Sequence, residues 1–203
     1  MPASSPATYY DPLPDLLQSV GRPIPMTEHS FPGAEDFLRG VWEERNWRNV
    51  PGPIYGAETD SCWVARTFAP GNAVYEHETG QEFLYRQPRD EDELLAVLAG
   101  AWADPFGGWA ADGDSHWTVQ AVRDWWQDRD RVSEWIKRDL RAITADDRRE
   151  VPAIVEVMDD FAAGLRAYQS YLDGPLEADL RVYMFWLDQG CAPKVGDGLP
   201  ELP

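Results

Sequence analysis

Apolar residues along this chain change their spacing near residue 90. Between residues 54 and 87 they come in short runs, which the pairs Pro70-Gly71 and Thr79-Gly80 separate. Short runs bounded by such pairs are typical of β-strands joined by turns. The pattern therefore predicts an antiparallel β-meander over this segment. Its expected strands are residues 62–68, 73–77 and 81–87, with residues 53–57 as an optional fourth.

Beyond residue 90 the apolar residues recur every three to four positions, as on one face of an α-helix. Acidic residues at positions 90–93 begin the first such segment, where they complement the positive end of a helix. Pro152 occupies the first turn of another, where a helix tolerates proline. Residues 176–187 have strand-like composition but helical spacing, and we follow the spacing. Helices are therefore expected at residues 90–103, 118–143, 151–172 and 176–187.

The segments before the meander contain a shorter helix and a proline-rich arm. Phe37, Val41 and Trp42 share one helical stripe, which predicts a helix at residues 35–47. Seven prolines in the first 33 residues exclude a long helix there, so we expect an extended arm with one turn near residues 15–20.

Strands that precede helices, rather than alternate with them, indicate an α+β fold. We expect one domain of 203 residues, in which the small β-meander packs against three or four C-terminal helices. Its parts are the arm (1–33), the α+β body (34–189) and an irregular tail (190–203). The predicted core consists of Val64, Phe83, Leu94, Leu98, Val122, Ile136, Leu140, Ile154, Met158, Phe161 and Leu165.

The charge of the chain limits the partners it can have. Thirty-six acidic against eighteen basic residues give a formal net charge of −18. Such a surface repels nucleic-acid phosphates and anionic lipid and attracts basic proteins. Ten tryptophans and 43% hydrophobic residues exclude a disordered acidic chain.

The N-terminal residues show neither the basic region nor the apolar region of a secretory signal. The longest nearly apolar run, residues 94–103, is about half of the roughly 20 residues that a membrane span needs. Cys62 and Cys191, without a signal, indicate free thiols in a reducing compartment. The sequence thus predicts a cytoplasmic protein that does not enter a membrane.

One catalytic arrangement can be drawn on the predicted meander. A two-residue turn at Pro70-Gly71 would place Cys62 diagonally across from His77, and a turn at Thr79-Gly80 would place Glu82 beside it. A thiol, a base and an orienting carboxylate make an activated nucleophile. The alternative is that Cys62 is a small buried apolar residue of a strand.

The loop at residues 104–117 gathers polar side chains that resemble metal ligands. Asp112, Asp114 and His116 are closely spaced, but the twelfth position counted from Asp112 is Arg123, which excludes an EF-hand. A second histidine or cysteine for zinc is also lacking nearby. We therefore expect no metal here, but a turn that caps the following helix.

Tryptophans cluster around the same loop. Trp125 and Trp126 are adjacent, about 100° apart on a helix, so only one of them fits a narrow core stripe. Either the other lies at a surface groove, where exposed tryptophan is typical of binding sites, or a wide core contact holds both. Together with the polar loop residues, this predicts a binding surface. Its residues are Trp109, Asp112, Asp114, His116, Trp117, Trp125 and Trp126.

A second local cluster combines Arg45 and Arg48 with Trp42 and Trp47. Arginine stacked on tryptophan can hold a carboxylate, or it can simply pack its stem over an indole. The sequence contains no G-x-G-x-x-G, Walker, G-x-S-x-G or H-E-x-x-H motif, so no cofactor is expected.

Two functions fit these observations. The first is an acidic protein-binding module, such as an inhibitor or immunity-type protein that neutralises a basic toxin. The second is a small cofactor-independent enzyme, with a site near Cys62, His77 and the loop at 104–117; Glu58 and Asp60 would add carboxylates to it. The oligomeric state stays open.

Overall fold

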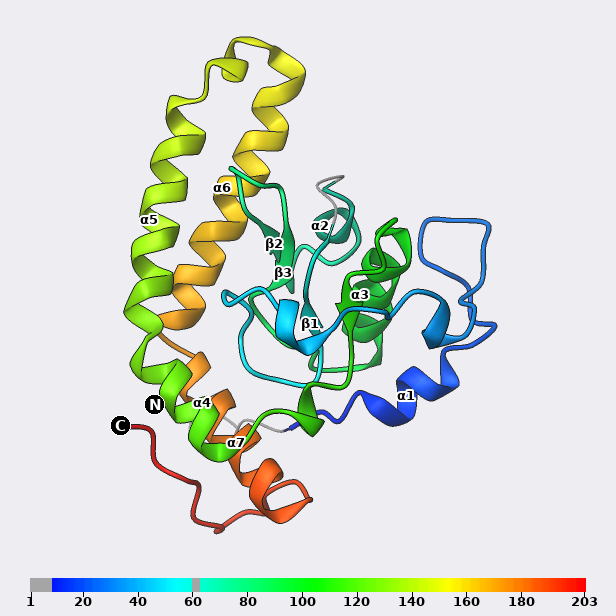
Figure 1. Ribbon diagram of the computed structural model, residues 1–203, viewed down its shortest axis with the longest axis vertical. Coiled ribbons are helices and arrows are strands. Elements are labelled where there is room, and N and C mark those ends of the chain that lie inside the picture. The colour runs from blue at the N-terminus through cyan, green and yellow to red at the C-terminus, as the bar shows by residue number, and fades with distance from the viewer. Residues whose placement is uncertain (1–8, 60–62) are drawn as a thin grey trace.

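The computed structural model describes residues 9–59 and 63–203 (Figure 1). Helices dominate this part of the chain and the strands are two or three residues long, which confirms the α+β fold. The helices are α1 (Leu13–Gln18), α2 (Val64–Phe68), α3 (Glu91–Ala103), α4 (Val119–Gln127), α5 (Arg129–Ala145), α6 (Pro152–Leu172) and α7 (Leu176–Gln189). The strands are β1 (Tyr55–Gly56), β2 (Ala73–Tyr75), β3 (Glu82–Leu84) and β4 (Trp109–Ala110).

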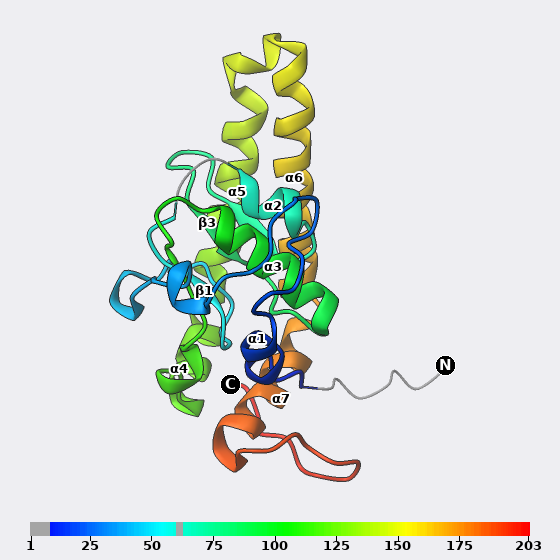
Figure 2. The ribbon, with the colours of Figure 1, turned by 90° about the vertical axis from the view of Figure 1, so that its right-hand side faces the viewer.

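The strands lie between two groups of helices. On one side α5 and α6 form a long antiparallel hairpin, and on the other α2 packs against α3 (Figures 1 and 2). Below the hairpin, α4 and α7 lie next to each other (Figure 1). Within the described ranges, no helix combines the length and the apolar character needed to cross a bilayer.

Two large clusters of buried side chains form most of the core, and a third, small one gathers Tyr55, Ala57 and Ala110. Of the two large clusters, the larger lies where the helical hairpin meets β2 and β3, and the smaller surrounds α3. Most of the predicted core is buried, while Val64, Leu140 and Ile154 are half-buried. The buried members of the prediction are Phe83, Leu94, Leu98, Val122, Ile136, Met158, Phe161 and Leu165.

The helices with the clearest apolar period begin and end close to where the sequence places them. Asp90 caps α3, because its Oδ1 accepts a hydrogen bond from the Glu93 N–H at 2.9 Å. Thr118 caps α4 in the same way, through Ala121 N–H at 3.1 Å. The helix expected at residues 176–187 is confirmed as α7.

The single helix predicted at residues 118–143 is wrong, since the structure has two helices there. Asp128, with φ −89° and ψ 6°, ends α4 and precedes α5. Aspartate competes with helical hydrogen bonding in a helix interior, which explains a break without proline or glycine. The apolar period continues across the break, and for this reason periodicity alone could not reveal it.

The three-stranded meander is also corrected. Strands β2 and β3 pair with each other, and β1 pairs with β4 in a separate two-stranded sheet. The described part of the first expected strand is helix α2. Glu82 accepts a hydrogen bond from the Ala65 N–H at 3.0 Å, which satisfies a donor in the first turn of α2. This tertiary contact outweighs the strand preference of the local sequence.

Two 3₁₀ turns, Ala34–Asp36 and Trp42–Glu44, replace the helix predicted at residues 35–47. The backbone between these turns pairs instead with residues 107–109: Gly40 N–H donates to the Trp109 carbonyl at 2.9 Å. A Cβ at Gly40 would lie 2.4 Å from the Gly108 oxygen, so this approach requires glycine.

Both end segments pack on the helices. In the arm, α1 forms where the turn was expected, and the ring of Tyr9 stacks on Trp186 with centroids 4.9 Å apart. In the tail, the carbonyl of Pro200 accepts a hydrogen bond from Arg181 Nε at 2.9 Å. The arm and the tail therefore both contact α7.

Candidate functional site

The catalytic arrangement of Cys62, His77 and Glu82 that the sequence suggested is not formed, because His77 and Glu82 do not pair. The β2–β3 register pairs Glu82 with Tyr75 and not with His77. Glu82 caps α2, as described above, and is buried. Cys62 and Asp60 lie outside the described residues. The enzyme hypothesis thus loses the contact between its base and its orienting carboxylate.

His77 has carboxylate neighbours of its own on the helical hairpin. Its Nε2 lies 2.8 Å from Asp146 Oδ2, and its backbone N–H donates to Asp139 Oδ2 at 3.1 Å. A hydrogen bond from Arg148 holds the pKa of Asp146 well below its usual range, so this carboxylate is charged. His77 therefore ties the turn between β2 and β3 to α5.

The polar loop is held by contacts within the protein. Asp112 accepts a hydrogen bond from the Tyr55 hydroxyl at 2.8 Å, and its other oxygen lies 3.2 Å from His116 Nε2. The imidazole of His116 stacks on Trp42, with ring centroids 4.7 Å apart. Both Asp112 and His116 remain exposed. In the described part of the chain, no three histidine, cysteine or acidic side chains gather as a metal site would require.

Asp114 points into the protein, although the sequence placed it on the binding surface. Its Oδ1 accepts a hydrogen bond from the Tyr183 hydroxyl at 2.7 Å, and its Oδ2 lies 3.4 Å from the Tyr9 hydroxyl. Burial raises the pKa of Asp114, and these two hydrogen bonds only partly oppose the rise. Asp114 thus joins the N-terminal arm to α7.

The tryptophans divide between core and surface. Trp109 was expected as a surface anchor, but β4 pairs with β1 and leaves Trp109 0% exposed. Trp117 and Trp126 are buried too, with 7% and 6% of their surface exposed. Trp125 is half-buried: it packs against the larger core cluster and also lines a small hollow.

We name this region the tryptophan face and define it by the half-buried indoles of Trp42, Trp47 and Trp125. Trp47 and Trp125 line a small hollow of about 100 Å³ together with Trp117 and Val132, and Trp42 lies beside it on Trp117, with ring centroids 5.2 Å apart. The proximity of segments 42–47 and 117–132 could not be predicted from the sequence, because it arises from tertiary packing.

Arginines stack on the indoles of the tryptophan face. The guanidinium carbon of Arg45 lies 3.9 Å from the ring centre of Trp42, and that of Arg131 lies 3.9 Å from the ring centre of Trp47. Arg48 is different: it is buried between Trp47 and Trp135, and its Nη2 lies 2.5 Å from Glu76 Oε1. Such contacts fix the orientation of the rings.

A larger hollow, which the sequence did not predict, lies beside α6 and α7. We name it the tyrosine cavity; its volume is about 500 Å³. Five tyrosines share its lining with two arginines and an aspartate. They are Tyr9, Tyr10, Tyr85, Tyr171, Tyr183, Arg86, Arg89 and Asp179.

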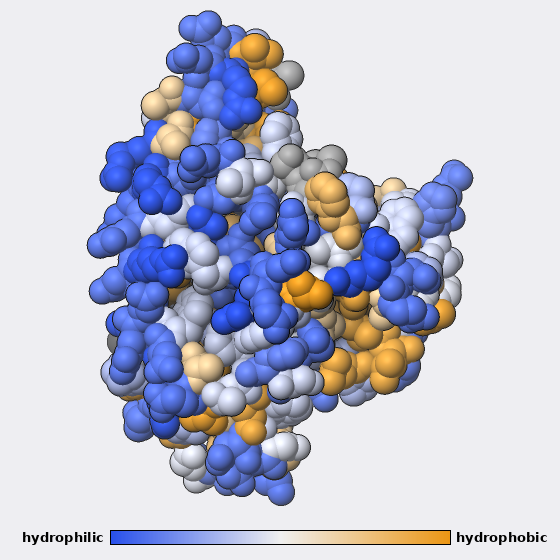
Figure 3. Space-filling view, in the orientation of Figure 1, coloured by the Kyte–Doolittle hydropathy of each residue, from blue (hydrophilic) through white to orange (hydrophobic). Residues whose placement is uncertain are grey.

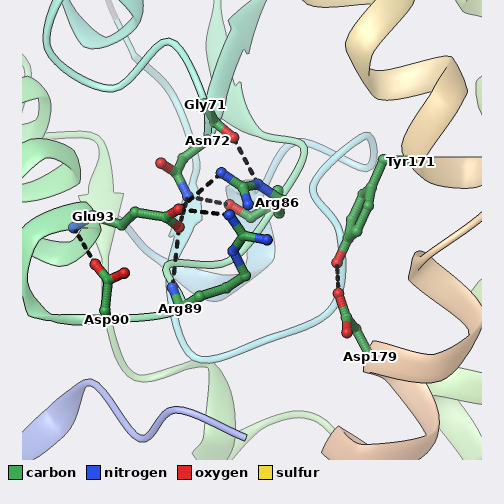
Figure 4. A network of polar contacts seen from close by, with 8 residues as sticks. All are labelled: Gly71, Asn72, Arg86, Arg89, Asp90, Glu93, Tyr171 and Asp179. Carbon is green, nitrogen blue, oxygen red and sulfur yellow. Dashed lines mark hydrogen bonds and ion pairs between the residues drawn. The ribbon is translucent and has the colours of Figure 1, made fainter. Parts of the chain in front are cut away.

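Figure 4 shows two groups of polar side chains at the tyrosine cavity. In one, Arg86 Nη2 and Arg89 Nη2 both donate to Glu93 Oε1, at 3.1 and 3.0 Å. In the other, the Tyr171 hydroxyl donates to Asp179 Oδ2 at 2.6 Å. Burial favours protonated Glu93, but the hydrogen bonds from Arg89 and Asn72 and the charge of Arg86 outweigh it and lower the pKa of Glu93.

Comparison of the chain with family models, with curated proteins and with solved structures found no match. The function is therefore argued from these two sites alone.

Proposed function

We propose that this protein is an acidic protein-binding module that contacts its partner through the tryptophan face. The observation that carries the proposal is the grouping of three half-buried indoles: Trp47 and Trp125 line one hollow, and Trp42 lies beside it on Trp117. Tryptophan is among the residues most enriched in binding hot spots, where a partly buried ring becomes fully desolvated.

Contacts within the free protein already fix the orientation of these indole rings. Arg45 and Arg131 each lie over one indole of the face, and Trp125 Nε1 donates to the Trp47 carbonyl at 3.4 Å. A ring that is already oriented loses less conformational entropy on binding. The face therefore supports a slow off-rate.

Exposed carboxylates border the face, and we call them its rim. Asp128 lines the hollow with Arg45 and Arg131, and Asp112 pairs with His116, which stacks on Trp42. Glu43 and Glu44 directly follow Trp42 in the chain and are exposed. Hydrophilic residues also cover most of the molecule in the view of Figure 3. With a net charge of −18, this rim favours a basic partner.

The particular function that we propose is that of an inhibitor, of the immunity type, which neutralises a basic protein such as a toxin in the cytoplasm. The charge disfavours nucleic acid and anionic membranes as partners. The function needs no cofactor, since binding itself blocks the partner.

The test replaces Trp125 by alanine. A partner captured from lysate of the source cells at low salt is identified, purified and measured by surface plasmon resonance. We expect Trp125→Ala to raise the off-rate roughly thirtyfold, which corresponds to a hot-spot loss of about 2 kcal/mol. Trp102→Ala is the matched control, because Trp102 is a half-buried tryptophan of the other core cluster. Equal effects of both variants, or a captured partner that is acidic, would contradict the proposal.

A further inference from the structure

The tyrosine cavity resembles a small-molecule binding site in its volume and in the number of chain segments that line it. Its volume of about 500 Å³ falls within the roughly 300–1,000 Å³ that is usual for ligand pockets. Its walls come from the N-terminal arm, residues 50–53, residues 85–89, α6 and α7. Segments distant in sequence thus close around one space, separate from the tryptophan face.

The walls of the cavity offer aromatic rings rather than free hydroxyl groups. Tyr9 and Tyr183 direct their hydroxyls to Asp114, and Tyr171 directs its hydroxyl to Asp179. Burial raises the pKa of each of these phenols, and the neighbouring carboxylates raise it further, so the phenols stay neutral. Neutral rings held in place suit a flat apolar ligand, which packs by stacking or edge contacts.

One end of the cavity is cationic. Arg86 and Arg89 extend from the segment between β3 and α3, and Glu93 orients both of them from outside the lining (Figure 4). Glu93 neutralises only one of the two positive charges. Each guanidinium carries five N–H donors, more than its contacts with the protein occupy, so donors remain for a ligand.

Asp179 adds a second negative charge, because the hydrogen bond from the neutral Tyr171 hydroxyl leaves its carboxylate charged, and this charge acts on Arg89. The lining carries two guanidinium groups and one carboxylate, in a chain whose net charge is −18. Together with Glu93, Asp179 balances the two guanidinium charges, so the preference for an anion rests on the remaining N–H donors of Arg86 and Arg89 and not on the local charge. The field of the whole molecule disfavours a multiply charged ligand.

We propose that the tyrosine cavity binds a small planar aromatic molecule with one anionic group, and that Arg86 and Arg89 hold the anion while the tyrosines hold the ring. A carboxylate and a phosphate monoester both present oxygens that a guanidinium recognises. This site is independent of the proposed protein partner and is tested without it.

The experiment is calorimetric titration of the purified full chain with 2-naphthoate, 2-naphthyl phosphate and the neutral analogue 2-naphthamide. We expect one equivalent of at least one anion to bind, roughly tenfold more tightly than the amide. The tighter of the two anions identifies the anionic group. Failure of both anions to saturate the protein at millimolar concentration would overturn the proposal, and so would equally tight binding of the amide.

Two variants test whether the ligand occupies the tyrosine cavity, and a third serves as a control. Arg89→Gln should weaken the anion roughly tenfold and leave the amide unchanged, while Arg166→Gln, at an exposed arginine of α6 outside the lining, should change neither. Ala167→Trp adds a large ring at an exposed position of the lining and should abolish binding of all three probes. If Arg89→Gln fails to fold, Ala167→Trp still decides, since retained binding would place the ligand elsewhere.

Discussion

Arg66 shows how one side chain determines local structure. Its guanidinium donates to Asp160 at 2.7 and 2.9 Å, and also to the carbonyl oxygens of Pro70 and Ala73, at 2.9 and 3.2 Å. It therefore joins α2, the following turn and α6, and it is buried. Such a buried cation is tolerated because its donors are paired.

The half-buried carboxyl of Asp114 should make the stability of the protein depend on pH. Because burial raises its pKa, the folded protein binds the proton of Asp114 more tightly than the unfolded chain does. Its contribution to folding is complete below the usual aspartate pKa of about 3.9 and is lost as the pH rises through the raised pKa. Asp114→Asn, which does not titrate, should therefore gain stability relative to the native protein between pH 4 and pH 7.

Urea unfolding followed at a series of pH values measures this difference. Asp188→Asn, at an exposed position near the end of α7, is the control and should show no such gain. A stability difference between Asp114→Asn and the native protein that stays constant over the whole pH range would contradict the assignment.

At the scale of elements, the contact between α2 and α3 depends on a glycine. Gly100 lies inside α3, where alanine normally stabilises a helix by about 1 kcal/mol. A Cβ at this position would lie 2.7 Å from Ala65 Cα, a backbone atom of α2 that cannot rotate away.

Gly100→Ala should therefore destabilise the protein, by about 1–2 kcal/mol after the gain in helix propensity is subtracted. The measurement is the free energy of unfolding in urea. Gly198→Ala, where no atom lies within 4 Å, should leave that free energy nearly unchanged. A stabilised Gly100→Ala would show that α2 can move away from α3.

The same elements show what the sequence can and cannot predict. Helices α6 and α7 were predicted because each presents several turns of one apolar stripe, and α3 because acidic residues mark its first turn ahead of an apolar segment. Strands of three residues carry too few positions for a period, and at α2 the decisive contact comes from Glu82, seventeen residues away from Ala65. Local pattern cannot report a contact of this kind.

The tryptophan face and the tyrosine cavity also differ in how far local sequence could predict them. Asp112, His116, Trp117 and Trp125 could be grouped from sequence because they lie in one loop and the helix after it. The tyrosine cavity could not, since its arginines precede α3 and its other polar pair lies on α6 and α7. A pair of arginines in an acidic segment, Arg86 and Arg89, was the one local signal of it.

At the scale of the whole molecule, the net charge of −18 affects the rate at which a basic partner associates more than the affinity of the complex. An attractive field raises the association rate of a basic partner, and salt screens it over about 10 Å at 0.1 M ionic strength. The contacts that hold the partner afterwards are short-range and are much less sensitive to salt.

Reversing two charges on the rim of the tryptophan face tests this separation. Glu43→Lys/Glu44→Lys should lower the on-rate at low salt more than Glu28→Lys/Asp188→Lys, which gives the same net charge at exposed sites elsewhere. The off-rate should change little in either variant. Stopped-flow association at two ionic strengths measures this, and equal on-rates would mean that the rim does not face the partner.

The turn that joins α5 to α6 has a consequence for local unfolding. Residues 147–152 of this turn are exposed where their side chains are described, and the 2.8 Å contact between His77 Nε2 and Asp146 Oδ2 ties its start to the body. The hairpin extends beyond the strands at this end (Figure 2). Opening it breaks few buried contacts, so its amide hydrogens should exchange with solvent through local fluctuation. Protection against exchange should therefore rise along the hairpin toward Trp135 and Leu165, where exchange requires the whole domain to unfold.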